Sequence, residues 1–160
     1  MKILVISDTH GAIHEIVKVI ENMEKPQLIL HLGDYVEDGE KIEKETGIKV
    51  EMVRGNGDFF NKRYEDDKVL EIEGKRIFMT HGHRYGVRHG VLNLLYRAEE
   101  LQADIVLYGH THVPMITKDA GIFLMNPGSP THPRGFYKSK TYGIINIKDT
   151  IDMTIEKIKF

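Results

Sequence analysis

The sequence contains no cysteine and no tryptophan among its 160 residues. Because cysteine is absent, disulfide bonds and thiolate metal sites are excluded, and any metal must be held by nitrogen and oxygen. Such ligands favour Mn, Fe, Ni or Zn over Cu(I) or an iron–sulfur cluster. The chain also lacks an apolar run near the roughly 18–20 residues of a membrane-spanning helix. Its first apolar run is short and has no small-residue cleavage site, so we expect no secretion leader. We therefore expect a cytoplasmic protein that does not contact membranes.

The chain also has little excess charge of either sign. It carries 22 lysine and arginine residues against 24 aspartate and glutamate residues, for a net charge of -2. A protein that binds long nucleic acids needs a basic surface, so we expect no such partner. The length suits one domain over residues 1–160, without repeats or a linker. Whether the protein forms oligomers cannot be read from the sequence.

Strands and helices alternate in the first half of the chain. Apolar runs predict strands at 2–7, 27–32 and 48–54. Between them, apolar residues at helical spacing predict a helix over 12–23, and a short polar helix is expected over 38–46. This order predicts a parallel sheet with right-handed crossovers.

The second half shows a different pattern. Hairpins are expected over 68–81, 114–126 and 141–160, with a helix over 87–101 and a strand at 104–108. A parallel first half and a meandering second half predict the α/β class. The expected architecture is two mixed β-sheets packed as a sandwich and flanked by α-helices.

Five predicted strands end at side chains that can bind a metal ion. Taken alone, an aspartate or asparagine in such a place is more commonly a helix-cap or turn residue. In open α/β sheets, however, ligands bind beyond the carboxyl ends of the strands. The joint occurrence therefore predicts a metal site, whose candidate residues, in chain order, are Asp8, His10, Asp34, Asn56, His81, His110 and His112.

The stretch GHTH places two of these histidines, His110 and His112, one residue apart. In extended backbone, positions i and i+2 point the same way and lie about 6.5 Å apart. Two imidazoles at that spacing can flank one ion or bind two ions about 3.5–4 Å apart, the separation used in two-metal phosphate chemistry.

These residues resemble the signature of the calcineurin-like metallophosphoesterase family. That signature reads D-x-H, G-D, G-N, H and G-H-x-H, and its matches are Asp8-Thr9-His10, Gly33-Asp34, Gly55-Asn56, His81 and Gly109-His110-Thr111-His112. The small size, the GNGD form and the segment NPGSPTHPRG at 126–135 resemble the compact prokaryotic phosphodiesterase branch. The resemblance implies the same sandwich of two mixed sheets.

The resemblance also implies a reaction and its cofactors. Two divalent metal ions are expected, Mn or Ni first and Fe or Zn as compatible alternatives. One ion would be held by Asp8, His10, Asp34 and His112, and the other by Asp34, Asn56, His81 and His110. A hydroxide between the ions would hydrolyse a small phosphate ester, with a diester as the leading expectation.

One departure from the wider family concerns the proton donor for the leaving group. Much of the superfamily has a histidine directly after the asparagine, where this chain has Gly57. The compact branch carries an acid one position later, so the resemblance implies this role for Asp58. Because two nearby cations would favour its ionised form, Asp58 could instead orient His83 or His132. Asp58 and His83 are therefore the candidate catalytic residues.

The remaining histidines are expected to have mixed roles. His14 is predicted to be exposed and His31 to be a hydrogen-bonded core residue, whereas His89, His132 and Arg134 could contact substrate or belong to ordinary loops. Glu37 and Asp38 are expected to be helix-start charges. The loops 59–66, 83–90 and 127–137 are expected to set specificity.

Two other functions compete with hydrolysis of a small ester. The first is a non-catalytic protein-binding scaffold of the same fold, and the retromer subunit of this fold resembles such a scaffold. The second is a nuclease. Every ligand position is filled, which favours an enzyme, and the chain lacks the basic groove that a nuclease needs.

Overall fold

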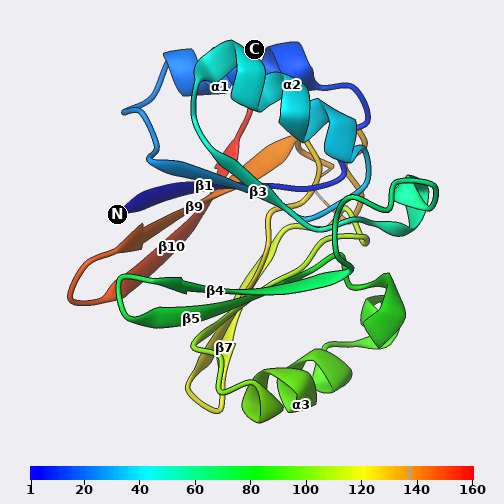
Figure 1. The fold of residues 1–160 in the computed structure, drawn as a ribbon, viewed down its shortest axis with the longest axis vertical. Helices are drawn as coiled ribbons and strands as arrows, with labels where there is room; N and C mark the ends of the chain where they lie inside the picture. The colour runs from blue at the N-terminus through cyan, green and yellow to red at the C-terminus, as the bar shows by residue number, and fades with distance from the viewer. Residues whose placement is uncertain (137) are drawn as a thin grey trace.

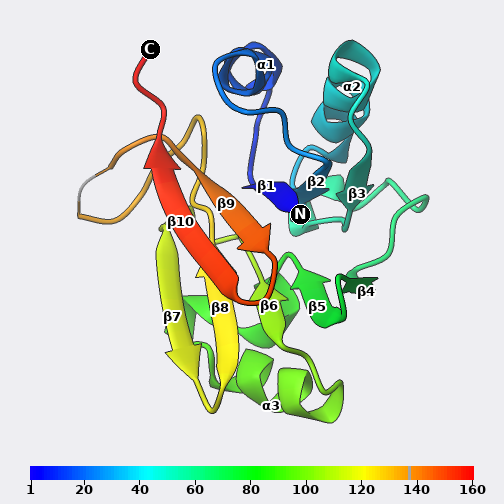
Figure 2. The same cartoon turned by 90° about the vertical axis from the view of Figure 1, so that its left-hand side faces the viewer.

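The computed structural model describes residues 1–136 and 138–160 and contains two five-stranded sheets (Figures 1 and 2). Tyr137, the last residue of the predicted specificity loop 127–137, lies outside the described residues. The first sheet has the order β10-β9-β1-β2-β3, with bounds Lys2–Ile6 (β1), Leu28–His31 (β2), Val50–Met52 (β3), Thr141–Ile147 (β9) and Ile151–Lys157 (β10). The second has the order β4-β5-β6-β8-β7, with bounds Asp67–Ile72 (β4), Lys75–Thr80 (β5), Ile105–Leu107 (β6), Met115–Asp119 (β7) and Ile122–Asn126 (β8).

Helices lie on the outer faces of both sheets, as predicted (Figure 1). The α-helices are Ile13–Glu21 (α1) and Val36–Thr46 (α2) over the first sheet, and Leu92–Glu100 (α3) over the second. Single turns of 3-10 helix occur at Asn56–Asp58 (η1), His83–Tyr85 (η2) and Val87–His89 (η3). Within the described residues, none of the helices combines the length and apolar character that a bilayer-spanning segment requires.

The apolar run of β1 follows from burial on both faces of its sheet. Ile3 and Val5 pack in the core between the two sheets. Leu4 and Ile6 face the other way and pack with Ile16 of α1. Because successive side chains of a strand alternate between faces, a strand covered on both sides must be apolar throughout.

Two expectations about the second half were wrong. The helix predicted over 87–101 is interrupted, because Gly90 has a φ of 132° and α3 begins only at Leu92. The second half is also not a simple meander, since β6 pairs in parallel with both β5 and β8, and β9 pairs with β1 of the other sheet. The helix α3 between β5 and β6 provides the crossover that a parallel pair requires.

Main-chain contacts bring the ends of distant strands together. The N–H of Asp8 donates to Gly33 O at 3.0 Å, which links the loops after β1 and β2. The N–H of Gly109 donates to His81 O at 3.0 Å, which links the loops after β6 and β5. The loops that carry the predicted ligands are therefore held beside one another by the backbone.

Candidate metal centre

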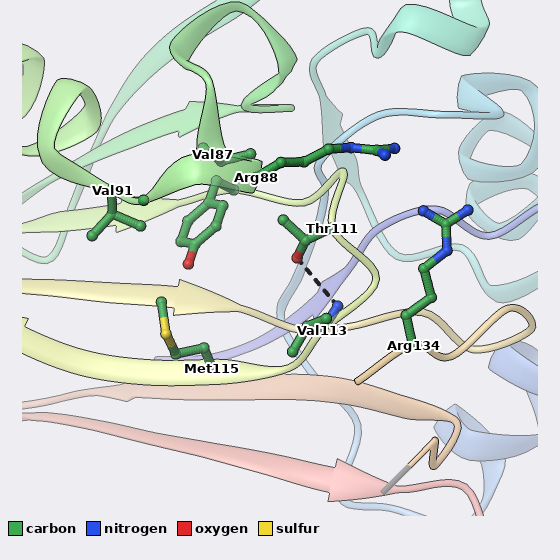
Figure 3. A pocket seen from close by; sticks show the side chains of 9 residues that line it. Val87, Arg88, Val91, Thr111, Val113, Met115 and Arg134 are labelled. Carbon is green, nitrogen blue, oxygen red and sulfur yellow. Dashed lines mark hydrogen bonds between the residues drawn. The ribbon is translucent and has the colours of Figure 1, made fainter. Parts of the chain in front are cut away.

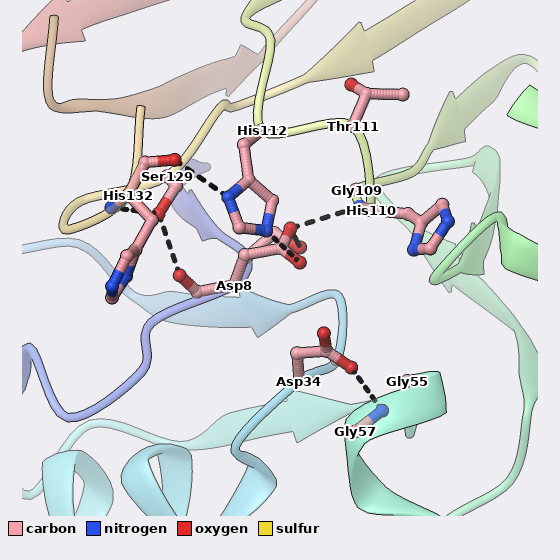
Figure 4. A network of polar contacts seen from close by, with 12 residues as sticks. Asp8, Asp34, Gly55, Gly57, Gly109, His110, Thr111, His112, Ser129 and His132 are labelled. Atoms are coloured by element: carbon pink, nitrogen blue, oxygen red, sulfur yellow. Dashed lines mark hydrogen bonds and ion pairs between the residues drawn. The ribbon is translucent and has the colours of Figure 1, made fainter. Parts of the chain in front are cut away.

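Two groups of side chains bring potential metal ligands together at the ends of the strands. Asp8, His10 and His112 form one group, and Asp8, Asp34 and His81 form the other, with the ligand atoms of each group within 4.8 Å of one another. Figure 4 shows the Asp8 side chain between His112 and Asp34. Asp8 belongs to both groups, whereas the family resemblance implies Asp34 as the shared ligand.

The other two predicted ligands lie next to these groups. The ring of His110 is 5.2 Å from that of His81 between centroids, and its Nε2 accepts a hydrogen bond from Arg88 Nε at 3.1 Å. Asn56 is exposed at the start of η1, directly after Gly55. The predicted ligand set therefore occupies one region of the molecule, with five members in the two groups.

Several inward-facing atoms of the centre lack hydrogen-bond partners. Among the described residues, Asp8 Oδ1, His10 Nε2 and His81 Nε2 are buried without one. His81 Nε2 lies 3.5 Å from Asp34 Oδ1 and 3.7 Å from Asp8 Oδ1. Because buried polar atoms are nearly always paired, unpaired nitrogen and oxygen atoms that converge on one point fit a cation.

The tautomers of two histidines are set by backbone carbonyls. His81 Nδ1 donates to Leu32 O at 2.7 Å, and His112 Nδ1 donates to His132 O at 2.7 Å. With the hydrogen on Nδ1, the lone pair of Nε2 points toward the carboxylates. Metal-binding histidines commonly have this second hydrogen bond, which orients the ring and fixes its tautomer.

Burial keeps two further rings in the neutral form that binds metal. It lowers the pKa of His10, and it lowers the pKa of His110 to about 4, with the charges of His81 and Arg88 acting in the same direction. Neutral imidazoles need not release a proton when a metal binds.

The carboxylate of Asp8 is held in its ionised form. Burial acts to raise its pKa, but contacts with His112, His81 and Ser7 outweigh burial and lower the pKa below its ordinary value. In return, the contact with Asp8, at 3.2 Å from His112 Nε2, raises the pKa of His112. Asp8 is thus available as an anionic ligand at neutral pH.

Most of the predicted ligands have an uncommon backbone conformation. Positive φ angles occur at 54° in Asp8, 43° in His10, 58° in Asp34, 69° in His110 and 58° in His112. Non-glycine residues rarely adopt this left-handed region, and strain of this kind concentrates at functional sites. The strain supports a functional role for these loops.

Two glycines of the motifs leave space that the aspartates fill. A Cβ at Gly109 would overlap Ser7 Oγ and lie 2.8 Å from Asp8 Oδ2. A Cβ at Gly55 would lie 2.6 Å from the backbone nitrogen of Asp34. These positions therefore require glycine for close approach of the loops.

The structure places Asp58 against the backbone. Its Oδ1 accepts hydrogen bonds from the N–H groups of Tyr35 at 2.8 Å and Val36 at 3.1 Å, and its Oδ2 accepts one from Gly55 at 2.9 Å. The buried carboxylate thus anchors both the start of α2 and the turn before Asn56. Its predicted role as leaving-group acid stays a prediction.

His83 and His132 lie on opposite sides of the centre. The His83 ring is 5.4 Å from His81 and 6.1 Å from His110 between centroids, and its Nδ1 is buried without a hydrogen-bond partner among the described residues. Burial lowers the pKa of His83. His132 is exposed, with its ring 4.9 Å from that of His10. Both rings are close enough to the ligands to meet a bound substrate.

A buried polar network that the sequence did not reveal supports the ligand loops. Gly33 N–H donates to His31 Nδ1 at 3.1 Å, so Nε2 carries the hydrogen and donates to Thr9 Oγ1 at 3.0 Å. Thr9 Oγ1 in turn donates to Asp38 Oδ2 at 2.7 Å. His31 is the hydrogen-bonded core histidine that the sequence predicts, and Asp38 lies in the first turn of α2.

The NPGS segment also positions the ligand loops. Ser129 Oγ donates to Asp8 O at 2.8 Å, and Asn126 Nδ2 donates to Gly109 O at 3.0 Å (Figure 4 shows Ser129). The resemblance singled out this segment, but nothing in the sequence assigned it these contacts.

Comparisons with known proteins identify a family and several relatives. Residues 1–150 match the model of the calcineurin-like phosphoesterase superfamily domain. The Bacillus subtilis protein named "Probable metallophosphoesterase YsnB" is 33% identical over 151 residues, which cover 93% of this chain and 86% of that protein. Phosphodiesterase YfcE of Escherichia coli K12 is 31% identical over 172 aligned positions, covering 91% of this chain and 88% of that protein.

A solved structure shows the same fold. The crystal structure of a predicted phosphoesterase from Streptococcus pneumoniae matches with a TM-score of 0.81 and 30% identity. The match covers 98% of this chain and 88% of the other.

Proposed function

The chain belongs to the calcineurin-like phosphoesterase superfamily, and from that premise we propose that it is a metal-dependent phosphodiesterase acting on a small diester with two divalent ions. The observation that carries the proposal is the pair of ligand groups sharing Asp8, whose unpartnered atoms converge. The family supports a phosphoesterase with divalent metal ions, and the similarity to phosphodiesterase YfcE supports a diester as substrate.

Each of the two groups would hold one ion. One ion would be bound by Asp8, His10 and His112, and the other by Asp8, Asp34 and His81. His110 and Asn56 would be additional ligands. Nitrogen and oxygen donors suit Mn or Ni, with Fe or Zn as alternatives. Divalent ions held by these residues would supply Lewis acidity, which lowers the pKa of water to about 7 and makes hydroxide available at neutral pH.

The residues of the chain contribute charge and orientation. Asp8 and Asp34 offset two of the four positive charges that two divalent ions bring, so the centre stays positive and attracts a phosphate anion. His81 and His112 are oriented by carbonyls before any metal binds. The chain needs no serine or cysteine nucleophile, so we expect direct in-line displacement without a covalent phosphoenzyme.

The test is a hydrolysis screen of chelator-stripped protein to which Mn2+, Ni2+, Fe2+ or Zn2+ is returned singly. Bis(p-nitrophenyl) phosphate and p-nitrophenyl phosphate serve as diester and monoester probes. We expect turnover of the diester to exceed that of the monoester. His81→Gln should lower kcat/KM on the order of 100-fold and reduce the bound metal, because it removes a ligand that an adjacent carbonyl orients.

The matched control is His14→Gln, which makes the same chemical change at an exposed position on α1. It should leave both turnover and metal content unchanged. Metal binding without turnover under every metal would contradict the proposal and favour the scaffold alternative. The filled ligand set and the strained ligand backbone argue against that alternative, since a scaffold requires neither.

A further inference from the structure

A largely apolar cavity of about 530 Å³ is lined in part by Arg88 and by Thr111 of the GHTH loop (Figure 3). Its walls come from η3, from the turn before α3, from the GHTH loop and from β7. Small-molecule sites typically have volumes of about 300–1,000 Å³, so this cavity is large enough for part of a substrate. Val113 and Met115, which line it, are 39% and 36% exposed.

The GHTH loop joins the cavity to the metal centre. Thr111 lines the cavity, whereas its neighbours His110 and His112 lie with the ligands. The Thr111 hydroxyl accepts hydrogen bonds from Val113 N–H at 3.2 Å and from Asn126 Nδ2 at 2.9 Å, which hold the loop in this arrangement. Arg88 gives a second link, because it lines the cavity and donates to His110 Nε2 at 3.1 Å.

Two arginines add positive charge between the cavity and the centre. Arg88 and Arg134 both line the cavity, and Figure 3 shows their guanidinium groups at one end of it, away from Val91 and Met115. Arg88 also lines a smaller cavity of about 170 Å³ together with His83 and His110. Neither arginine forms a salt bridge within the described part of the chain, so their charges are available to an anion.

The chemistry of the lining favours an aromatic ring over an aliphatic or cationic group. The thioether of Met115 makes favourable contacts with the edges of aromatic rings. Tyr108 contributes a further ring to the wall. A polar glycerol group would leave its hydroxyls unpaired against apolar side chains, and a choline group would be repelled by the arginines.

We propose that this cavity binds an aromatic ester group of the substrate, while Arg88 and Arg134 contact its anionic oxygens. The proposal rests on the proposed function, because it takes the phosphate to lie at the metal centre. It narrows the substrate class to phosphodiesters that carry a planar ring, either a simple aryl group or a nucleobase.

The first test measures binding to protein loaded with diamagnetic Zn2+ and needs no catalysis. Phenylphosphonate and methylphosphonate differ only in the ring, and both are titrated into protein with labelled methionine, valine and isoleucine methyl groups. We expect phenylphosphonate to shift the NMR signals of Met115 and Val113 and to leave Ile116 unchanged. If phenylphosphonate at saturation shifts neither Met115 nor Val113, the proposal is overturned.

The second test measures inhibition of diester hydrolysis by the metal-loaded enzyme. The inhibition constant of phenylphosphonate should be about tenfold lower than that of methylphosphonate. Met115→Glu should bring the ratio of the two inhibition constants, the phosphonate ratio, to near one. Ile116→Glu is the matched control, because Ile116 is the next residue of the same edge strand, is 39% exposed and does not line the cavity. It should leave the ratio intact.

The arginines are tested with the same two inhibitors. Arg88→Gln and Arg134→Gln should each weaken both phosphonates about tenfold and leave their ratio unchanged, because the charge contacts the shared anion. Adenosine 5′-phosphate as a third ligand identifies the ring: binding tighter than that of phenylphosphonate assigns a nucleobase, and weaker binding assigns a simple aryl group.

The outcomes separate this proposal from the proposed function. If the enzyme hydrolyses diesters but the two phosphonates inhibit it equally, the proposal for the cavity is overturned and the proposed phosphodiesterase activity stands. A protein that hydrolyses no ester with any metal would refute the phosphodiesterase, and the NMR titration would still decide whether the cavity binds a ring.

Discussion

Backbone strain at single residues is concentrated on the predicted ligands. Five of them adopt positive φ, and each such residue costs roughly 1–3 kcal/mol relative to a relaxed conformation. Glycines next to them leave the space in which the aspartates approach other loops. The packing of two sheets and three helices therefore has to offset a local cost, as is common where a fold holds a reactive site.

The hydrogen bonds of the Asp58 carboxylate lead to a prediction for a single substitution. Its carboxylate accepts three backbone N–H groups, so Asp58→Asn should lower the free energy of unfolding by about 1–3 kcal/mol, because an amide nitrogen would face a donor. If Asp58 only positions the turn, hydrolysis of diesters with good and with poor leaving groups should fall by the same factor. A larger loss on poor leaving groups would instead support proton transfer by Asp58. Denaturant titration and a leaving-group series measure the two effects.

At the scale of elements, the candidate site is formed by loops that follow the ends of several strands. β1, β2, β5 and β6 each deliver a ligand from the loop that follows, and the network of His31, Thr9 and Asp38 connects the loop after β1 with the end of β2 and the start of α2. The network lies beneath the ligands and is fully buried at His31 and Thr9. It therefore couples the position of Asp8 to the packing of α2.

The network predicts a pH dependence of stability. Burial lowers the pKa of His31 to about 4 from an ordinary value of 6.5, so below pH 6.5 the unfolded chain binds a proton that the folded protein does not. The stability present above pH 6.5 is then lost as the pH falls toward 4. In chelator-treated protein, the wild type should lose about 2 kcal/mol more than His31→Gln between pH 7.5 and pH 5.

The same measurement on His14→Gln provides the control, because His14 is exposed. That variant should follow the wild type across the pH range. Equal pH dependence in the wild type and in His31→Gln would show that His31 does not titrate in this way.

At the scale of the whole molecule, the residues of the candidate metal centre come from both sheets. Asp8 and Asp34 follow strands of the first sheet, and His81 and His112 follow strands of the second. A ligand that binds only the folded state stabilises it by about 2.7 kcal/mol at a concentration of 100 times Kd. For a chain of this length, that corresponds to a rise in Tm of roughly 5–10 °C.

We therefore expect Mn2+ to raise Tm and a chelator to reverse the rise. His112→Gln, which removes a ligand from one of the two groups, should give a smaller rise at the same Mn2+ concentration. Scanning calorimetry with and without metal measures both. An unchanged Tm despite measured metal binding would mean that the ions do not bind preferentially to the folded state.

Much of the fold and the ligand set was readable from the chain. The strand at 2–7 and the hairpin over 68–81 follow from local patterns, and both are confirmed. The prediction of one helix over 87–101 was wrong because Gly90 interrupts the backbone even though the apolar residues have helical spacing. The pairing of β9 with β1 could not be read, because residues more than 130 positions apart leave no periodic signal in one sequence.

The sequence by itself determined which residues could bind metal and that they follow strand ends, because residue type and periodicity are properties of neighbouring positions. Only the tertiary structure decided that Asp8 belongs to both ligand groups, that Asp58 holds the backbone and that Arg88 and Arg134 flank one cavity. Those relations depend on how two sheets pack and on which loops meet at their edges, and no local pattern in the chain records that.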